Sequence, residues 1–405
     1  MIPTPPDART TVFLLFVAAL VAILARRLRL PTSAGLLIAG AALTLAPGWT
    51  ATVGLDRRTL FTLLLPPLIF EGALNLKWRE LRRDLNLVTA LTTFGVIAAA
   101  AVASALMHFG LRWAWTPALY FGVLIAATDP IAVLANFKEL GVDGRPRLLV
   151  EAESLLNDGT AVVMFGLVVL MTGHPGASDL GLHLGIAILR DVGGAIAIGL
   201  AVGWLLVLLA GRASDPLTET TFTAVAAYGS YFLADSIGAT GILASVAAGL
   251  VMGNVGMRAN DYVSPRGKEV AEAIWDFAAF VANSLVFLLM GMYVARTHVL
   301  RHPGLLVAGI AVGLVARFVT VYGICGLFAK TRAAVPALSQ HLLFWGGQRG
   351  GLSLVLALGL VTSAVPQASQ VSAATVGVVA FSILVQGTTF RPLMRFLERK
   401  SAPLS

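Results

Sequence analysis

Apolar stretches of about 20 residues, separated by short polar connections, recur along the whole chain. A helix needs about 20 apolar residues to cross a bilayer core roughly 30 Å thick. The pattern predicts about thirteen such spans, centred near residues 18, 39, 66, 98, 124, 160, 201, 228, 247, 285, 314, 350 and 380. The chain is therefore predicted to be an all-α polytopic membrane protein.

Two of these spans are interrupted at corresponding places in the two halves of the chain. The fifth, YFGVLIAATDPIAVLANF, contains Asp129 and Pro130, and a proline both lacks an N–H and disfavours helix at the residue before it. The twelfth, HLLFWGGQRGGLSLVLALGL, has glycine pairs on both sides of Arg349. Corresponding breaks are typical of transporters built from inverted repeats with a binding site near the bilayer midplane, although each could also be a simple kink.

Broken helices place helix ends inside the membrane. Irregular backbone is tolerated there only where protein or a watery cavity satisfies its polar groups, so the half-helix ends are expected to face each other. Helix N-termini are partly positive and C-termini partly negative. Asp129 and Arg349 are therefore expected first to neutralise these ends, and only secondly to be ligands.

Composition and charge change the picture in one respect, the orientation. Hydrophobic residues make up 57% of the 405 positions, charged residues 12%, and the net charge is +8. With the N-terminus outside, twenty of the 29 Lys and Arg residues fall in connections on one side and seven on the other. This positive-inside asymmetry predicts a multi-pass protein of the cell inner (plasma) membrane with a cytoplasmic C-terminus, and no nucleic-acid partner.

Residues 1–405 are predicted to form a single transmembrane domain without a soluble regulatory domain, because the connections are short and few residues follow the last span. The longest polar connection, residues 253–276, is expected to be a short interfacial helix or a plain linker. The single cysteine, Cys325, excludes a disulfide framework and a cysteine-based metal site.

Ionisable residues inside spans are costly and are candidates for function by default. Those predicted here are Glu71, Asp129, Asp158, Arg317 and Arg349, with Glu153 nearer a membrane edge. Some are expected to form buried ion pairs that merely hold helices together. Because two arginines face four acids, at least one acid has no arginine partner, and Asp158 is the candidate.

The stretch EAESLLNDGTAV, residues 151–162, would present polar side chains along one strip of a helix. Ser154 and Asp158 are four residues apart and share a face, and Glu153 and Asn157 repeat this spacing. Hard cations prefer several oxygen ligands. We expect this strip, opposite the break at Thr128, to bind Na⁺ or Li⁺.

One buried carboxylate suffices for exchange, since burial disfavours its charged form while a proton or a cation neutralises it. The sequence has no G-x-x-x-x-G-K-[ST] phosphate loop and no H-E-x-x-H pattern. We therefore expect a transporter driven by an ion gradient and not an enzyme, with no cofactor and with Na⁺ (or Li⁺) and H⁺ as the transported species.

At these residues the chain resembles the monovalent cation/proton antiporters, in particular the electroneutral NhaP-like branch of sodium/proton exchangers. The resemblance covers nearly the full length. Six ordered motifs carry it: LLPPLIFEGALN (64–75), AATDPIAVL (126–134), ESLLNDGTAVV (153–163), NSLVFLLMGM (283–292), ARFVTVY (316–322) and GGQRGGLSL (346–354).

The resemblance implies two inverted six-helix repeats joined by the seventh helix, with helices five and twelve as the crossing discontinuous pair. It also implies a homodimer in the lipid bilayer, and a core subdomain that moves against a dimerisation subdomain. Electrogenic relatives have a second aspartate where this chain has Asn157. The implied exchange is therefore electroneutral, one proton for one cation.

The resemblance also implies a role for each candidate residue. Asp158 binds the cation and the proton, and Thr128, Ser154 and Glu71 help to coordinate. Glu153 and Asn157 support the site. Arg317 and Arg349 are structural charge partners or tune access.

Three other functions stay open. A potassium/proton antiporter would use the same fold, since residue types alone do not fix cation selectivity. A cation channel would favour symmetry-related filters around a pore, and none is visible in the sequence. An intramembrane aspartyl hydrolase could use Asp129 and Asp158 as its acid–base pair, but the chain lacks a G-x-G-D motif.

Overall fold

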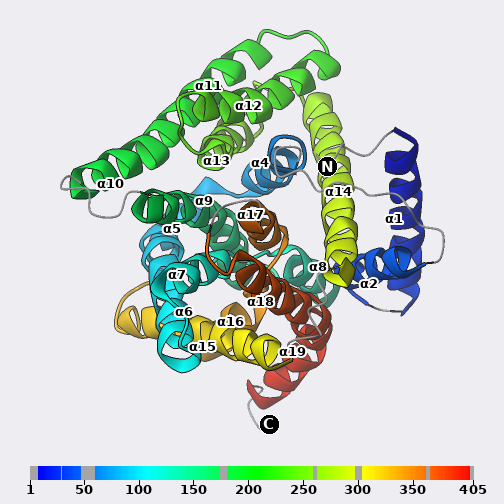
Figure 1. The fold of residues 1–405 in the computed structure, drawn as a ribbon. Coiled ribbons are helices and arrows are strands. Elements are labelled where there is room, and N and C mark those ends of the chain that lie inside the picture. The colour runs from blue at the N-terminus through cyan, green and yellow to red at the C-terminus, as the bar shows by residue number, and fades with distance from the viewer. Residues whose placement is uncertain are drawn as a thin grey trace. The chain divides into compact units, whose positions relative to one another are not determined.

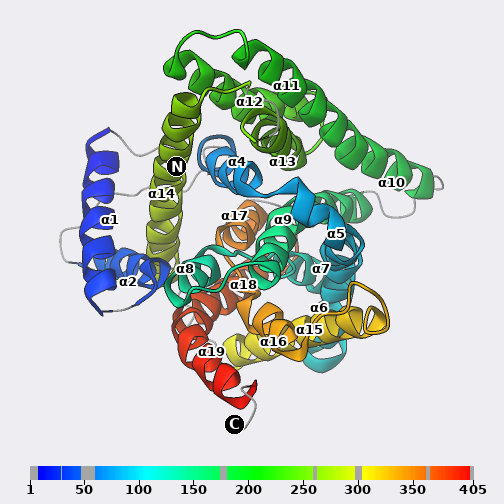
Figure 2. The ribbon, with the colours of Figure 1, turned by 180° about the vertical axis from the view of Figure 1, so that it is seen from behind.

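The computed structural model describes residues 8–28, 30–46, 60–173, 180–258, 262–296, 303–361 and 365–401. Within these ranges the chain forms helices and turns, apart from one isolated antiparallel bridge. The prediction of an all-α protein is confirmed. Figures 1 and 2 show the helices from opposite sides.

In the described part of the chain, helical segments correspond to all thirteen predicted spans, with the centre predicted near residue 350 falling in the interruption between two half-helices. In chain order they are α1 (Ala8–Leu28); α2 (Thr32–Leu45); η1 (Leu60–Leu64) with α4 (Leu65–Asn75); α5 (Trp78–Thr89), η2 (Ala90–Phe94) and α6 (Gly95–Leu111); α7 (Trp115–Leu124) and α8 (Ile131–Leu140); α9 (Arg145–Gly173); α10 (Leu180–Ile188), η3 (Leu189–Gly194) and α11 (Ala195–Ala210); α12 (Pro216–Ser236); α13 (Gly241–Val251) with η4 (Met252–Gly256); α14 (Pro265–Arg296); α15 (Pro303–Leu327); α16 (Ala337–Gly346) and α17 (Gly351–Val361); and α18 (Ala368–Phe381), η6 (Ser382–Gln386) and α19 (Gly387–Ser401).

Seven continuous helices among the described residues are long and apolar enough to cross a membrane. Three more helices are apolar but shorter, namely Thr32–Leu45, Gly241–Gly256 and Gly351–Leu360. Several long helices contain a π-helical turn (η2, η3 and η6), and such turns are inserted in otherwise α-helical segments. The chain is a multi-pass membrane protein.

Both predicted interruptions are present. The fifth segment stops at Leu124 and resumes at Ile131, directly after Pro130. The twelfth stops at Gly346 and resumes at Gly351. Pro130, which lacks a backbone donor, is the cap from which α8 begins, and Gly346 and Gly347 lie where α16 ends.

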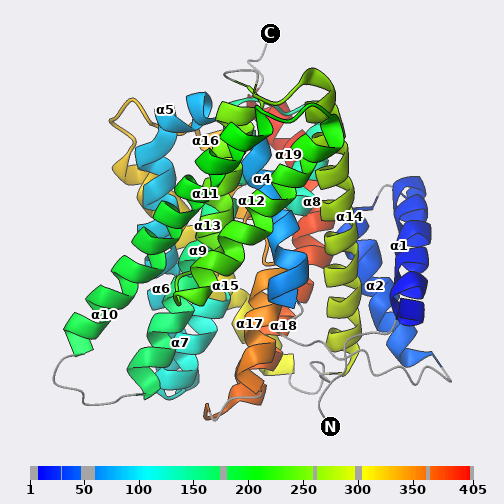
Figure 3. The same cartoon turned by 90° about the horizontal axis from the view of Figure 1, so that it is seen from above.

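The helices group into two compact units. The first unit contains residues up to 60, residues 84–157 and residues 284–405. Within it α6 packs against α7 and α15, and α15 and α17 both pack against α18. Figure 2 shows α6 beside α15, and Figure 3 shows α17 beside α18. Both interrupted segments belong to this unit.

The two breaks contact each other inside the first unit. The backbone N–H of Asp129 donates to the carbonyl of Gln348 at 2.7 Å, which forms the isolated bridge. Gly350 lies so close to Asp129 that a Cβ on this glycine would overlap the aspartate side chain. The pairing replaces hydrogen bonds that each segment lost when it left the helix.

The second unit contains residues 61–83 and 158–283. Helices α4, α11, α12 and α13 pack together there, and their shared core includes Phe70 and Trp275 with ring centroids 4.7 Å apart. Pro67 cannot donate to the carbonyl of Leu63, four residues earlier. The hydroxyl of Tyr228 donates to that carbonyl instead, at 3.1 Å.

The expected interfacial helix or linker at residues 253–276 needs correction. Residues 252–256 form η4, the end of the α13 segment, and residues 265–276 are the first turns of α14, which continues without interruption to Arg296. Residues 259–261 lie outside the described ranges. The hydroxyl of Ser264 caps α14 by accepting from the N–H of Gly267 at 3.0 Å. The polar residues 265–276 are therefore part of α14 and do not form a separate interfacial helix or linker.

Replacing Gly350 with alanine is expected to separate the two breaks. The added methyl group would force the Asp129 side chain or the backbone to shift, lowering the free energy of unfolding by about 1–3 kcal/mol. The control is Gly326→Ala on α15, where a Cβ meets no atom within 4 Å. Thermal unfolding of the two purified variants in detergent checks this, and equal melting temperatures would contradict the close approach.

Candidate functional site

Two charged side chains lie at the ends of the half-helices. The carboxylate of Asp129 accepts from the N–H of Ile131 at 3.0 Å, in the first turn of α8, and from the N–H of Gly351, at the start of α17. Arg349 donates to the carbonyls of Ala126 and Ala127 at 3.4 Å, just beyond the C-terminus of α7. A negative group therefore faces helix N-termini and a positive group faces a C-terminus, as dipole compensation requires.

Thr128 is the point at which the break meets α9. Its backbone N–H donates to Oδ1 of Asn157 at 3.4 Å, and Nδ2 of Asn157 donates to its hydroxyl at 2.6 Å. Its hydroxyl also shares a hydrogen bond with Ser154 at 3.0 Å. All three side chains are at most 2% exposed. The predicted contact between α9 and the break at Thr128 is therefore present. It is a buried cluster of two hydroxyl groups and the side-chain amide of Asn157.

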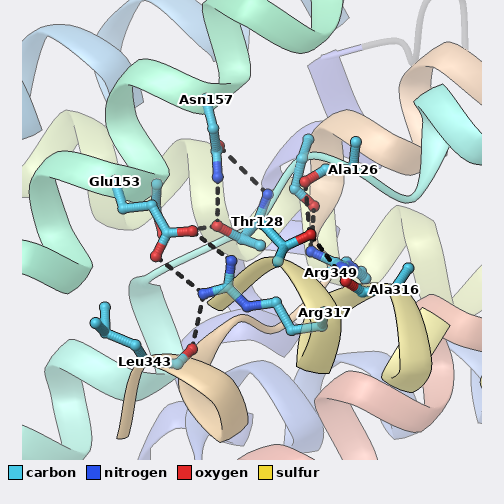
Figure 4. A network of polar contacts seen from close by, with 11 residues as sticks. Ala126, Thr128, Glu153, Asn157, Ala316, Arg317, Leu343 and Arg349 are labelled. Carbon is cyan, nitrogen blue, oxygen red and sulfur yellow. Dashed lines mark hydrogen bonds and ion pairs between the residues drawn. The ribbon is translucent and has the colours of Figure 1, made fainter. Parts of the chain in front are cut away.

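Glu153 and Arg317 form a buried, two-pronged ion pair between α9 and α15. Nη1 of Arg317 bonds Oε1 of Glu153, and Nη2 donates to Oε2 at 2.9 Å. Nη2 also donates to the carbonyl of Leu343 at 2.7 Å, near the end of α16. Figure 4 shows this pair beside the Thr128–Asn157 contact and Arg349. Arg317 therefore joins α9, α15 and the first half of the broken segment.

Asp158 and Glu71 belong to the second unit. Asp158 follows Asn157 on α9, one helical turn beyond Ser154, and is partly exposed. Glu71 lies on α4 and accepts from Nδ2 of Asn75 at 2.6 Å. The roles of both acids in ion binding stay predictions.

The C-terminal turn of α4, which carries Asn75, is fixed by side chains from η4 and the residues after it. Arg258 donates to the carbonyls of Leu74 and Asn75 at 3.0 and 3.1 Å. Asn254 donates to the carbonyl of Leu76 at 2.9 Å and accepts from the N–H of Trp78 at 2.8 Å. These donors satisfy helix-end carbonyls that have no partner within the helix, and they hold the turn on which Asn75 meets Glu71.

Glu151, at the start of the polar stretch on α9, is largely covered by protein. Its side chain is 16% exposed, and one of its carboxylate oxygens lies 3.9 Å from Arg147, one turn earlier on α9. The Arg147 side chain is 40% exposed and also pairs with Asp143 at 3.1 Å. Arg147, and not water alone, therefore accommodates the charge of Glu151.

Several groups at the site were not identified from the sequence. They are mostly backbone atoms: the carbonyls of Ala126, Ala127, Leu343 and Gln348. Any residue type supplies a carbonyl, so the only available signal was the interruption of the helix itself. The pairing of Arg317 with Glu153 was also not specified, because four acids competed for two arginines.

Loss of Arg317 is expected to be strongly destabilising. Arg317→Met would leave the charge of Glu153 buried without its partner, at a cost of about 3–5 kcal/mol. Adding Glu153→Gln to the same chain should recover part of this loss. A double-mutant cycle of thermal stability in detergent measures both effects.

The matched control is the exposed pair of Lys77 and Glu80, whose side chains are 60% and 43% exposed. Lys77→Met should cost less than about 1 kcal/mol, because water screens the pair. Equal losses for Lys77→Met and Arg317→Met would show that the buried pair is not a stabilising link.

Comparisons with known proteins agree with this architecture. Residues 13–396 match the family described as "Sodium/hydrogen exchanger, transmembrane". The chain is 34% identical over 378 residues to the low-affinity Na⁺/H⁺ antiporter NhaS1 of Synechocystis, covering 91% of this chain and 70% of the relative. It is 32% identical over 395 residues to the Na⁺/H⁺ antiporter NhaH of Halobacillus aidingensis, covering 95% and 96%.

A solved structure shares the fold. The sodium proton antiporter MjNhaP1 from Methanocaldococcus jannaschii at pH 8 superposes with a TM-score of 0.77 at 18% sequence identity, over 95% of this chain and 97% of that one. The likeness between these two structures concerns the fold, whereas the family model and the relatives are matched by sequence. By these matches, the chain belongs to the sodium/hydrogen exchanger family.

Proposed function

We propose that this protein exchanges Na⁺ or Li⁺ for H⁺ across the cell inner membrane, one for one, with the cation and the proton competing for Asp158. The similar relatives are named as Na⁺/H⁺ antiporters, which supports the reaction class. The observation that carries the assignment to Asp158 is its place on α9, one helical turn beyond Ser154, whose hydroxyl lies 3.0 Å from that of Thr128 at the break. Glu153 is held by Arg317, and Asp129 is held by the N–H groups of two half-helices.

Those two acids are poorly suited to carry protons through a cycle. Protonating Glu153 would leave Arg317 buried and unpaired, and protonating Asp129 would remove the negative charge that faces the N-termini of α8 and α17. Each protonation would cost free energy, because the charge or helix end left without its partner lies in a medium of low dielectric constant. Asp158 is partly exposed and lies next to the Thr128 cluster in sequence, so it can meet both an ion and water.

The cation ligands follow from the same cluster. The hydroxyls of Thr128 and Ser154 lie 3.0 Å apart, and Ser154 and Asp158 share a face of α9. Two hydroxyl oxygens and one carboxylate are suitable ligands for a hard monovalent cation that sheds its water. Glu71 is proposed as a further oxygen ligand. Asp129, Glu153, Asn157, Arg317 and Arg349 are proposed to support the site without binding the ion.

The neutral side chain of Asn157 sets the proposed stoichiometry. Both ends of its amide are used by Thr128, so it holds the site together without adding a charge. With one titrating carboxylate, loading one cation releases one proton. The site carries the same charge whether it holds a cation or a proton. Exchanging one for the other therefore moves no net charge across the membrane.

We also propose a homodimer with a core subdomain and a dimerisation subdomain interleaved within residues 1–405. The N-terminus would lie outside and the C-terminus in the cytoplasm. The distribution of Lys and Arg between the connections supports this orientation.

Asp158→Asn is expected to abolish exchange, because an amide can neither release a proton nor neutralise a cation. The assay uses everted vesicles with a pH-sensitive dye, to which Na⁺, Li⁺ and K⁺ are added in turn. Glu151→Gln on the same helix is the control and should respond like the unchanged protein. Proton movement in Asp158→Asn vesicles would refute the mechanism, and a response to K⁺ alone would assign potassium/proton exchange instead.

Exchange in proteoliposomes is expected to be independent of membrane potential. A net charge moved in each cycle would gain about 2.3 kcal/mol at 100 mV, which shifts the transport equilibrium roughly 50-fold. The measurement compares Na⁺-driven proton flux at zero potential and at an imposed potential of about 100 mV. A clear dependence would mean that a second carboxylate carries a proton.

A further inference from the structure

A groove on the first unit is not used by the proposed transport cycle. It has a volume of about 420 Å³ and lies between the α5–η2 segment and the end of α15. Its lining residues are Leu85, Asn86, Thr89, Ala90, Phe94, Ile324, Leu327 and Phe328. Phe94 and Leu327 are 67% and 80% exposed, so the groove opens onto an outer, apolar face. This volume is within the range of roughly 300–1,000 Å³ typical of ligand sites.

The groove lies where the apolar spans give way to polar chain. One wall belongs to the apolar helix Trp78–Leu111 and the other to Pro303–Leu327. Asn86 and Thr89 supply the polar side chains of the lining, and the remaining lining residues are apolar. A ligand here would contact hydrocarbon along most of its length and polar groups at one end.

Basic residues gather at the polar end. Lys330 and Arg332 follow Phe328 closely and are exposed. On α5, Arg82 lies one turn before Asn86 on the same face, and Arg83 lies beside it in sequence. Among the described residues these four basic side chains form no ion pair. The positive charge next to the groove is therefore available to an outside partner.

The two basic segments are held together by Arg145. Its guanidinium binds the carboxylate of Asp84 at 2.7 Å, and Asp84 directly precedes the groove residue Leu85. The same guanidinium donates to the carbonyls of Ala333 and Ala334 at 2.8 and 2.7 Å, directly after Arg332. The Asp84 side chain is 10% exposed. The basic end of the groove is thus fixed before any partner arrives, which lowers the entropic cost of binding.

We propose that this groove binds an anionic phospholipid of the bilayer. One acyl chain would lie against Leu85, Phe94 and Leu327, and the phosphate would lie near Lys330 and Arg332. Basic pockets beside transmembrane helices are suited to anionic headgroups, and the positive-inside rule assigns both segments to the cytoplasmic leaflet, where such lipids carry negative charge. The combination of an apolar trough and unpaired basic groups favours a lipid over a second copy of the chain.

The test is native mass spectrometry of the detergent-purified protein with phosphatidylglycerol and with phosphatidylethanolamine of the same acyl chains. We expect phosphatidylglycerol to bind the unchanged protein more tightly. Lys330→Ala combined with Arg332→Ala should weaken phosphatidylglycerol binding roughly tenfold or more, given the attraction of each basic residue to an anionic surface. Binding of phosphatidylethanolamine should hardly change.

The matched control combines Arg266→Ala with Arg395→Ala. Both residues are exposed, neither lines the groove, and both are assigned to the same membrane side, so this variant loses the same charge. It should bind phosphatidylglycerol like the unchanged protein. Equal weakening in both double variants would overturn the site, as would equal affinity of the unchanged protein for the two lipids.

Filling the groove gives a second readout that keeps all charges. Thr89→Trp places a large side chain in the trough and should weaken phosphatidylglycerol binding. Ala90→Phe does the same from the next position and serves if the first variant does not fold. Undiminished binding with the groove filled would mean that the lipid lies elsewhere.

Discussion

A helix that breaks inside a bilayer exposes N–H and C=O groups to which hydrocarbon cannot hydrogen-bond. Many contacts in this structure provide partners for those groups. The breaks in the fifth and twelfth segments satisfy each other through the N–H of Asp129 and the carbonyl of Gln348. Gly350 permits the close approach, and Arg349 and Asp129 balance the helix ends. The candidate site depends on these unwound segments, which are stable inside the protein because their polar groups are paired.

The same constraint divides the acids by role. Protonation of an acid that holds a helix end or a buried arginine would undo a structural contact. Asp129 and Glu153 are of this kind. A carrier has to change its protonation in every cycle. The place of Asp158 one helical turn beyond Ser154, and not acidity alone, is the reason we propose it as the carrier.

Much of the fold was predictable from the sequence, because hydrophobic length and helix breakers act locally. The thirteen segments and both interruptions follow from apolar stretches, Pro130 and the glycine pairs around Arg349. The partners of the charges were less predictable. That Arg317 binds Glu153 and the Leu343 carbonyl depends on which helices pack together, and backbone acceptors carry no sequence signal. The polar start of α14 was misinterpreted because an apolar pattern does not mark where a long helix begins outside the membrane.

The side-chain amide of Asn157 forms hydrogen bonds to Thr128 through both its oxygen and its nitrogen. A carboxylate in its place would bring a charge, but it would also lose the donor that now meets the threonine hydroxyl. On the one-for-one exchange proposed above, the residue that sets the coupling ratio is also the residue that links α9 to the break. A carboxylate at this position would therefore change the charge of the site and the hydrogen bonds of that link together.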